Sequence, residues 1–420
     1  MVFSSNNYPP EAAAPCSEAE HLEPGPARGK KRLLYLALSD PDLEVTGATV
    51  RMGAFVKHLS RYYDITLVNM SGSGHRVEHR IEERFRDRDN RLGITRRVRV
   101  KFSQTGYFLL SPALFHQARQ LLRNAPFDYL LADYGLAGVY GHFLSRLHRI
   151  PLIYSAHNVE HRMYQVLGHR DFRRKLLAPY VYWAERAACK SAALVVAISP
   201  QDRSQFARWV PNERIEVVPQ GFDPEVANPF YQPSAGNRPA ILFVGSFRSE
   251  NNRLAARRIV EIIMPEVLRV RPDVKFQLIG TDPPKEVRSD AVECPGFVDD
   301  LGPYLRRAHV VIAPMPFAQG MSSKIVLALA YGKSVLATAE AVAGFRHTYR
   351  QLSIQPVEKF AEKIVQLLGQ DLSVDTGEFS MLCDEFAWPN LLARLYSRIE
   401  NVRSRSMVST CPEMEATAWH

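Results

Sequence analysis

The chain has 420 residues and a formal net charge of +9; 46% of its residues are hydrophobic and 23% are charged. This length and composition suit a globular protein with a large core that is divided into two domains. No apolar run approaches the roughly 20 residues needed to span a bilayer, so no transmembrane helix is predicted. The positive charge favours an anionic partner, such as a phosphate-bearing substrate, a membrane surface or nucleic acid.

The first 29 residues are rich in Pro, Ala, Ser and Glu and have neither a basic start nor an apolar stretch. We expect residues 1–29 to be a disordered lead-in and not a signal peptide. Five cysteines are scattered along the chain without paired spacing. This pattern argues against a disulfide framework and against a zinc site, and it fits a reducing cytoplasm.

The first predicted elements are those of a nucleotide-binding fold. Residues 30–38 are a basic lead into a continuous apolar run, as expected for a buried parallel strand. A polar loop over residues 39–46 leads to Gly47, where the backbone can either approach a ligand or simply turn. A helix over residues 49–62 and a second strand over residues 65–68 follow.

The next stretch, residues 77–101, alternates acidic residues with many arginines. They are Arg80, Arg84, Arg86, Arg88, Arg91, Arg96, Arg97 and Arg99. One interpretation is a solvated helix with internal ion pairs. The other is a basic face that contacts anionic lipid headgroups, where each basic residue contributes roughly 1 kcal/mol. Asp40-Pro-Asp42 and Asp87-Arg-Asp89 are D-x-D patterns, which we interpret as chance matches, so no metal site is predicted.

A candidate catalytic residue follows two more buried strands, over residues 127–132 and 152–156. His157 and Asn158 come directly after the second strand, at the edge where open α/β sheets bind ligands. This position favours a functional His157 over a structural one. Asn158 is expected to cap the next helix, and Glu160 and His161 to form its polar start.

The boundary between the two domains falls in a segment rich in proline. Strands over residues 194–200 and 215–218 close the first half, and residues 224–239 then hold four prolines together with Gly, Asn and Ser. We predict a first domain over residues 30–218, a linker over 219–239 and a second domain over 240–384.

A strand, loop, helix and strand over residues 309–338 form the centre of the second domain. The backbone amides of Met321, Ser322 and Ser323 are predicted at a helix N-terminus beside Lys324, a favourable place for a phosphate group. The helix over residues 324–331 is closed by Gly332. An ordinary loop between strand and helix has the same general pattern.

Several segments resemble the retaining GT-B glycosyltransferases, in particular glycosyltransferase family 4. The strongest are residues 296–305 and residues 324–332, and residues 215–223 are similar to the family's crossing between domains. The segment from Ser155 to His161 is similar to the family's His-Asn-x-Glu motif. The resemblance covers roughly residues 30–400 and is most specific between residues 240 and 345.

The resemblance implies a set of site residues. The catalytic candidates are Gly47, His157 and Gln319. The candidates for binding the donor are Gly245, Arg248, Asn252, Phe297, Val298, Met321, Ser322, Ser323, Lys324 and Leu327. Gln319 and Leu327 stand where the family usually has the two glutamates of its E-x7-E motif, and a leucine cannot accept hydrogen bonds from ribose hydroxyls.

The implied fold is α/β with GT-B architecture: two Rossmann-like domains face each other across a cleft, a helix over residues 385–403 crosses back to the first domain, and residues 404–420 form a loose tail. The implied activity is retaining transfer of a sugar from a nucleotide-diphosphate sugar to a glycan, lipid-linked or small-molecule acceptor. No metal or other cofactor and no nucleic-acid partner is expected. We expect a cytoplasmic protein with peripheral contact to the inner face of an anionic membrane.

Two other functions fit the same segments. The substitutions Gln319 and Leu327 favour a catalytically degenerate GT-B module that binds a nucleotide sugar or glycan or supports a partner enzyme. A UDP-sugar epimerase on the same fold is the other alternative, although the resemblance lies in the transferase segments.

Overall fold

The computed structural model describes residues 29–37, 47–71, 94–101, 112–135, 137–168, 172–225, 227, 238–283, 290–298, 300–317, 321–370 and 374–408. The expectations for the N-terminal segment, for both D-x-D patterns and for Gln319 lie outside these residues.

The first domain is built on a parallel sheet of seven strands in the order β3-β2-β1-β4-β5-β6-β7. The strands are β1 (Lys31–Ala37), β2 (Tyr63–Ser71), β3 (Ile94–Lys101), β4 (Tyr129–Asp133), β5 (Leu152–Ser155), β6 (Ala192–Ala197) and β7 (Ile215–Val217). β1 pairs with β2 and β4, so the chain order reverses at the centre of the sheet. Ligands of open α/β sheets bind beside such a reversal, at the carboxyl ends of the strands.

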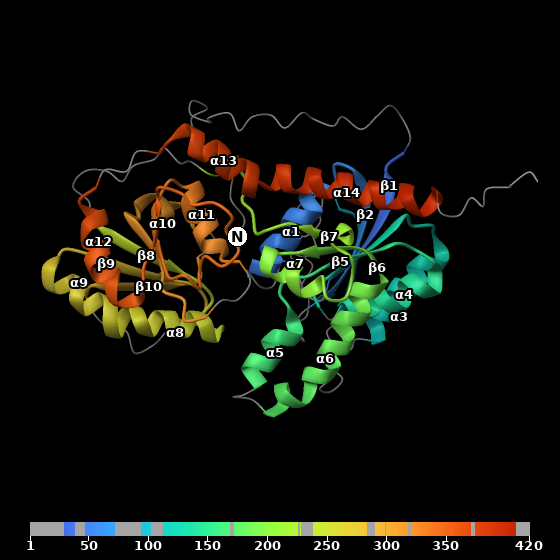
Figure 1. Ribbon diagram of the computed structural model, residues 1–420, viewed down its shortest axis with the longest axis horizontal. Helices are drawn as coiled ribbons and strands as arrows, with labels where there is room; N and C mark the ends of the chain where they lie inside the picture. The colour runs from blue at the N-terminus through green and yellow to red at the C-terminus, as the bar shows by residue number, and fades with distance from the viewer. Residues whose placement is uncertain are drawn as a thin grey trace, which may run out of the picture.

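Helices cover both faces of this sheet because its central strands are apolar on both sides. They are α1 (Gly47–Leu59), α3 (Pro112–Asn124), α4 (Ala137–His148), α5 (Glu160–Gly168), α6 (Phe172–Ser191) and α7 (Pro200–Phe206). One core contains α3 and α4, and the other contains α1 and the C-terminal helix. Figure 1 shows α5 and the first half of α6 projecting away from the sheet.

The second domain has a parallel sheet of six strands in the order β10-β9-β8-β11-β12-β13. The strands are β8 (Ala240–Val244), β9 (Lys275–Ile279), β10 (Val292–Gly296), β11 (Val310–Ala313), β12 (Ser334–Ala337) and β13 (Leu352–Ile354). The helices are α8 (Glu250–Arg258), α9 (Met264–Val270), α10 (Gly302–Arg307), α11 (Ser323–Ala330), α12 (Phe360–Leu368) and α13 (Thr376–Phe386). A π-helical segment, Ile259–Ile263, joins α8 to α9. The predicted α/β class is confirmed in both domains.

The prediction of a solvated helix over the arginine-rich stretch is wrong for its last part. Ile94–Lys101 is strand β3, which pairs with β2 at the edge of the first sheet. Arg96, Arg97 and Arg99 lie in this strand. Charged residues suit an edge strand because they oppose pairing with the edge of another chain.

Two segments connect the domains, and they lie side by side. Phe222 donates its amide to the Phe386 carbonyl (3.0 Å), and its own carbonyl accepts from the Trp388 amide (3.0 Å). A Cβ atom on Gly221 would lie 2.5 Å from the Phe386 oxygen, so only glycine fits this approach. The crossing therefore consists of two segments that are hydrogen-bonded to each other at Phe222.

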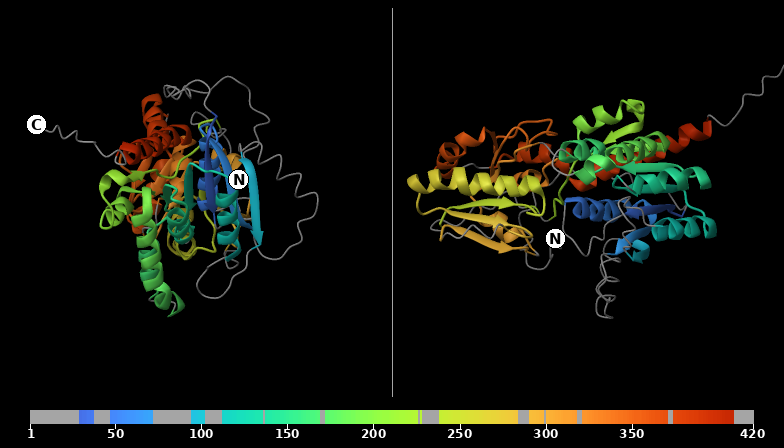
Figure 2. Two further views of the ribbon diagram at one scale, coloured as in Figure 1. Left: turned by 90° about the vertical axis from the view of Figure 1, so that its right-hand side faces the viewer. Right: turned by 90° about the horizontal axis from the view of Figure 1, so that it is seen from below.

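The predicted crossing helix differs in its bounds. α13 ends at Phe386, Ala387 is extended (φ −69°, ψ 128°), and α14 runs over Trp388–Val408. Pro389 lies in the first turn of α14, where a helix tolerates proline because the amides there have no acceptor within the helix. In Figure 1, α13 lies beside the second domain and α14 along the first, and the right-hand view of Figure 2 shows the two domains end to end.

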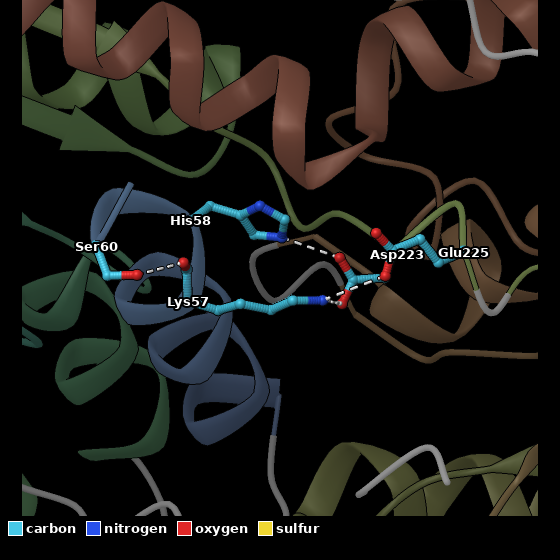
Figure 3. Close-up of polar contacts among 5 residues, drawn as sticks. All are labelled: Lys57, His58, Ser60, Asp223 and Glu225. Atoms are coloured by element: carbon cyan, nitrogen blue, oxygen red, sulfur yellow. Dashed lines mark hydrogen bonds and ion pairs between the residues drawn. The ribbon is translucent and has the colours of Figure 1, made fainter. Parts of the chain in front are cut away.

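Helix α1 holds the first crossing segment by its charges (Figure 3). Lys57 Nζ lies 3.0 Å and His58 Nε2 lies 2.9 Å from the two carboxylate oxygens of Asp223, and Lys57 Nζ also lies 3.9 Å from Glu225. Burial alone would raise the pKa of Asp223, but His58 and Lys57 lower it below its ordinary value. The ionised Asp223 thus ties the crossing to the first domain.

Two further observations bear on the sequence expectations. Within the described residues, no helix is both long enough and apolar enough to cross a membrane. Cys189 and Cys294 are free thiols, whereas Cys383 is disulfide-bonded, which the scattered cysteine spacing did not predict.

Candidate active site

His157 lies at the carboxyl edge of the first sheet, where the sequence predicted it. It follows β5 by two residues, and Asp133 ends the neighbouring strand β4, in register with Ser155. His157 Nε2 lies 2.8 Å from Asp133 Oδ1, and both side chains are buried. A charge-assisted hydrogen bond to a fixed carboxylate holds the imidazole in one orientation. Asp133 was not among the predicted site residues.

The carboxylate of Asp133 is stabilised by its surroundings. Burial would raise its pKa, but His157, the Ser155 hydroxyl and the Arg51 guanidinium together lower it below its ordinary value. The ring of Tyr134 packs edge-on against His157, with centroids 5.6 Å apart, and Tyr134 has a left-handed backbone (φ 80°). Asp133 is therefore an anion over the whole neutral pH range.

Arg51 connects this pair to the interdomain crossing. It comes from α1, is 1% exposed, and donates from Nη1 to the Pro219 carbonyl (2.9 Å). Burial lowers the pKa of the guanidinium to about 10, although Asp133 and Tyr35 favour its charged form. Arg51 thus bonds the crossing segment and also stabilises Asp133. It therefore couples the position of His157 to the crossing segment.

A second buried carboxylate fixes the helix after His157. Glu185 of α6 accepts hydrogen bonds from the Glu160 amide (2.9 Å) and the His161 amide (3.2 Å), and it lies 2.6 Å from His161 Nδ1. A carboxylate at a helix N-terminus satisfies amides that have no acceptor within the helix. The cap of α5 is thus Glu185, whereas the sequence suggested Asn158.

On the second domain, Lys324 is a buried cation beside the predicted donor loop. Its Nζ donates to Asn252 Oδ1 (2.8 Å), lies 3.7 Å from Met315 Sδ, and lies 4.7 Å from the centre of the Phe243 ring. No carboxylate among the described residues forms an ion pair with it. Burial lowers the pKa of Lys324 to about 7. A bound phosphate group would supply the missing counter-charge.

Asn252 and Gly245 are arranged around this lysine. Asn252 Nδ2 donates to the Ser246 carbonyl (2.8 Å), which orients its oxygen toward Lys324. A Cβ on Gly245 would meet Asn252 at 2.8 Å, and one on Gly280 (φ 150°) would meet the Gly245 oxygen at 1.9 Å. The two glycines allow the loops after β8 and β9 to pack closely and present Asn252 to the lysine.

Arg248 is on the same loop but points elsewhere. Its Nε donates to Asp282 Oδ2 (2.6 Å), and its side chain is 61% exposed. The structure therefore does not bring Arg248 and Lys324 to a common contact; an exposed arginine can turn toward a ligand only by leaving Asp282.

The donor loop approaches the first domain at Gly47. Ser322 is the N-cap of α11 but makes no capping bond with its side chain, and its Oγ is buried without a hydrogen-bond partner. A Cβ on Gly47 would lie 3.8 Å from Ser323 Oγ. Gly47 is the first residue of α1 and not a loop residue. The amides at the start of α11, Lys324 and Gly47 thus come from both domains to one region.

The other predicted donor residues of the second domain differ in their exposure. Met321 is buried in the core of the second domain, and Leu327 and Val298 are partly buried against that core. Phe297, directly after β10, is 45% exposed. Gln319 lies outside the described residues. Leu327 is held in the core by its apolar contacts and offers no polar atom to a ligand.

Two family models match the sequence and together cover most of it. Residues 45–226 match Glycosyltransferase Family 4, and residues 238–370 match Glycosyl transferases group 1. The chain belongs to glycosyltransferase family 4 (group 1). The predicted family and enzyme class are confirmed, and no comparison supports the degenerate module as an alternative. None of the curated protein sequences matches the transferase significantly.

Solved structures resemble the transferase over nearly their whole lengths. HepE of Anabaena in complex with UDP has a TM-score of 0.65 at 17% identity and covers 88% of this chain and 100% of its own. Sucrose-phosphate synthase from Thermosynechococcus elongatus has a TM-score of 0.69 at 17% identity, over 89% of this chain and 100% of its own. These similarities confirm the predicted GT-B architecture.

The fold does not by itself exclude an epimerase. A putative UDP-N-acetylglucosamine 2-epimerase from Listeria monocytogenes has a TM-score of 0.58 at 12% identity, over 88% of this chain and 97% of its own. The family models, which are those of transferases, decide between the two.

Sequence reasoning missed Asp133, Arg51 and Glu185. A signal for Asp133 existed, because it is a carboxylate directly after a predicted strand, like His157 after the next one. Arg51 lies inside a helix and Glu185 near the end of another, so nothing local distinguishes them from surface residues.

Proposed function

We propose that the transferase moves a sugar from a nucleoside diphosphate sugar to an acceptor hydroxyl. The observation that carries this proposal is the buried Lys324, which has no carboxylate partner in the described part of the chain and stands beside the start of α11. HepE of Anabaena has been solved with UDP and with UDP-glucose, which supports a donor of this class.

The chemistry that these residues favour is electrostatic. When the bond between the anomeric carbon and the diphosphate oxygen breaks, its electron pair stays on the diphosphate. Lys324 and the first amides of α11 would stabilise that charge, and Arg248 would join them after leaving Asp282. We propose that no metal is required and that the configuration at the anomeric carbon is retained, as the family resemblance implies.

His157 is proposed to contact the transferred sugar. The pairing with Asp133 supports this role, because the carboxylate holds the imidazole in one orientation toward the carboxyl edge of the sheet.

The acceptor is proposed to be a glycan or a lipid-linked or small molecule. We further propose a cytoplasmic location with peripheral contact to an anionic membrane, since the chain carries a net charge of +9.

Calorimetry with UDP, GDP and ADP tests the donor site. We expect one of the three to bind wild-type protein, and replacement of Lys324 by Ala to weaken that binding by roughly 1.5 to 3 kcal/mol, the range for hydrogen bonds to charged groups. Arg248→Ala is expected to weaken it in the same direction. Unchanged affinity in both variants would contradict the phosphate site, and loss of turnover in EDTA would contradict the metal-free mechanism.

A further inference from the structure

The helices α3, α4, α5 and α6 have an unusual charge distribution. Together they contain nine Arg or Lys residues and only two acidic residues, Glu160 and Glu185. Both glutamates are buried, at 4% and 1% exposure. The outer surface of this whole group of helices therefore carries no carboxylate of its own, and most of the net positive charge of the chain lies here.

Large apolar side chains are exposed on the same helices. Phe143 (48%) and Leu147 (54%) are one turn apart on α4, and Trp183 (47%) and Leu176 (72%) are on α6. Soluble proteins rarely expose several large apolar side chains together unless the surface binds something.

The ring of His142 joins Phe143 of α4 to Trp183 of α6. The ring of His142 lies 4.9 Å from that of Phe143 and 6.3 Å from that of Trp183, and Trp183 stacks on Tyr180 at 6.3 Å. His142 Nδ1 also lies 2.5 Å from Ser191 Oγ at the end of α6. Figure 1 shows α4 and the second half of α6 on the first domain, away from the second domain.

Basic residues border this apolar surface. Arg186 and Lys190 follow Trp183 at spacings of three and seven residues, so they lie on its side of α6, and both are exposed. On α4, the exposed Arg146 lies one turn after Phe143 and directly before Leu147. Burial lowers the pKa of His142, and the charge of Arg146 lowers it further. We define the docking face as Phe143, Arg146, Leu147, Trp183, Arg186 and Lys190.

We propose that the docking face binds the surface of a bilayer that contains anionic lipids. Exposed aromatic and aliphatic side chains insert at the boundary between headgroups and acyl chains, and basic residues beside them attract anionic headgroups. An acidic protein partner would be attracted by the charge, but it does not explain why several large apolar side chains stand among the basic residues. This inference rests on the membrane contact proposed above and places it on α4 and α6 instead of on the arginine-rich stretch.

Sedimentation with phosphatidylcholine vesicles, with and without phosphatidylglycerol, tests the proposal. We expect the full-length protein to bind the anionic vesicles, to bind the neutral ones weakly, and to dissociate as the salt concentration rises. The variant Phe143→Ser/Trp183→Ser should lose binding at all salt concentrations. Arg186→Ala/Lys190→Ala should weaken it by about thirtyfold, at about 1 kcal/mol for each basic residue removed.

Matched controls come from the second domain. Ile262 and Val270 are equally exposed, and Arg257 and Arg269 are exposed basic residues. Ile262→Ser/Val270→Ser and Arg257→Ala/Arg269→Ala should bind vesicles like wild type. Nucleotide affinity should be unchanged in all four variants, so a failure here leaves the proposed transfer activity untouched.

Each alternative result has a distinct meaning. If wild type binds anionic vesicles and the docking-face variants bind equally well, the contact lies elsewhere and this inference is wrong. If wild type binds neither kind of vesicle, the membrane contact itself is wrong. If soluble polyglutamate competes with the vesicles while the Phe143→Ser/Trp183→Ser variant binds normally, the face serves an acidic protein instead.

Discussion

At the scale of single residues, the pairing of Asp133 with His157 predicts how the histidine can be disabled without removing it. In Asp133→Asn the shape is kept but the negative charge is lost, so the imidazole loses its fixed orientation. We expect kcat to fall by about 10- to 100-fold, which is typical of a misplaced catalytic group. His157→Ala should lower transfer by about 10²-fold or more. Steady-state kinetics measures both effects.

The controls for Asp133 separate catalysis from folding. UDP affinity should be unchanged in Asp133→Asn, since the diphosphate contacts proposed here are in the second domain. Asp384→Asn, at an exposed position on α13, should behave like wild type. Full activity in His157→Ala would remove both residues from the mechanism.

Lys324 should stabilise the complex with nucleotide at the expense of the free protein. Its pKa is about 7 in the folded chain and ordinarily 10.5, so between these values the unfolded chain binds more protons and stability rises with pH. Below about pH 7 the contribution of Lys324 to the stability of the free protein is constant and unfavourable. Lys324→Met should therefore raise the stability of the free protein at pH 7, by up to about 1.4 kcal/mol for each pKa unit of the shift.

Thermal melts between about pH 6 and pH 11, a range that spans the folded and unfolded pKa values of Lys324, would show this effect. The methionine variant should melt higher than wild type near neutral pH, and the difference should shrink as the pH rises. Stabilisation by UDP should be lost in the variant. Lys359→Met removes an exposed lysine and should change neither property. A variant that melts lower than wild type at pH 7 would show that Lys324 is paired in the free protein.

At the scale of elements, helix α11 has Leu327 where the family pattern has a glutamate. Leu327 packs against the core of the second domain, and a carboxylate there could accept hydrogen bonds from ribose. We expect Leu327→Glu to tighten nucleotide binding by about 1 to 2 kcal/mol through charge-assisted bonds, and to lower the melting temperature of the free protein because a carboxylate is partly buried.

Calorimetry and melting curves for wild type and Leu327→Glu distinguish the outcomes. Leu327→Gln provides a neutral control that can accept hydrogen bonds and should give a smaller gain. If neither wild type nor Leu327→Glu binds any nucleotide at millimolar concentration while both remain folded, the proposed donor site is wrong.

The elements differ in how well their sequences predict them. The central strands read as apolar runs because both faces of a parallel sheet are covered, and the helix after Ser322 was predicted to within a residue. Strand β3 was not predicted, because an edge strand has charged residues that also suit a solvated helix.

His157 could be selected from its position after a strand, whereas its contact with Asp133 required the register of β4 against β5. The bond from Arg51 to Pro219 joins residues 168 positions apart, which no local pattern reveals.

At the scale of the whole molecule, the paired crossing segments depend on Gly221. A Cβ at this position would lie 2.5 Å from the Phe386 oxygen and 2.8 Å from Trp388, so Gly221→Ala must separate the two segments. We expect a loss of about 1 to 3 kcal/mol in stability, as for other overpacked sites, and a change in domain closure with nucleotide. Small-angle scattering and denaturant melts would report the two effects.

Gly53→Ala is the matched control for Gly221→Ala. Gly53 lies inside α1, and a Cβ there would meet no atom within 4 Å. This variant should gain about 0.5 to 1 kcal/mol, because alanine restricts the unfolded chain and favours the helix. Equal stability of the two variants would mean that the crossing relaxes freely around a side chain.

The path of the chain through the crossing also sets the order in which the protein can fold during synthesis. Trp388, Leu391, Leu392, Leu395 and Ile399 of α14 belong to the same core as α1 and β1. The first domain, although its sheet is made first, therefore lacks one wall of its core until α14 has left the ribosome. The second domain precedes α14 in the chain, so the core of the first domain is closed only after the second domain has been made. A nascent chain that stalls after α13 would present an open apolar surface on its first domain, which is the kind of surface that chaperones bind.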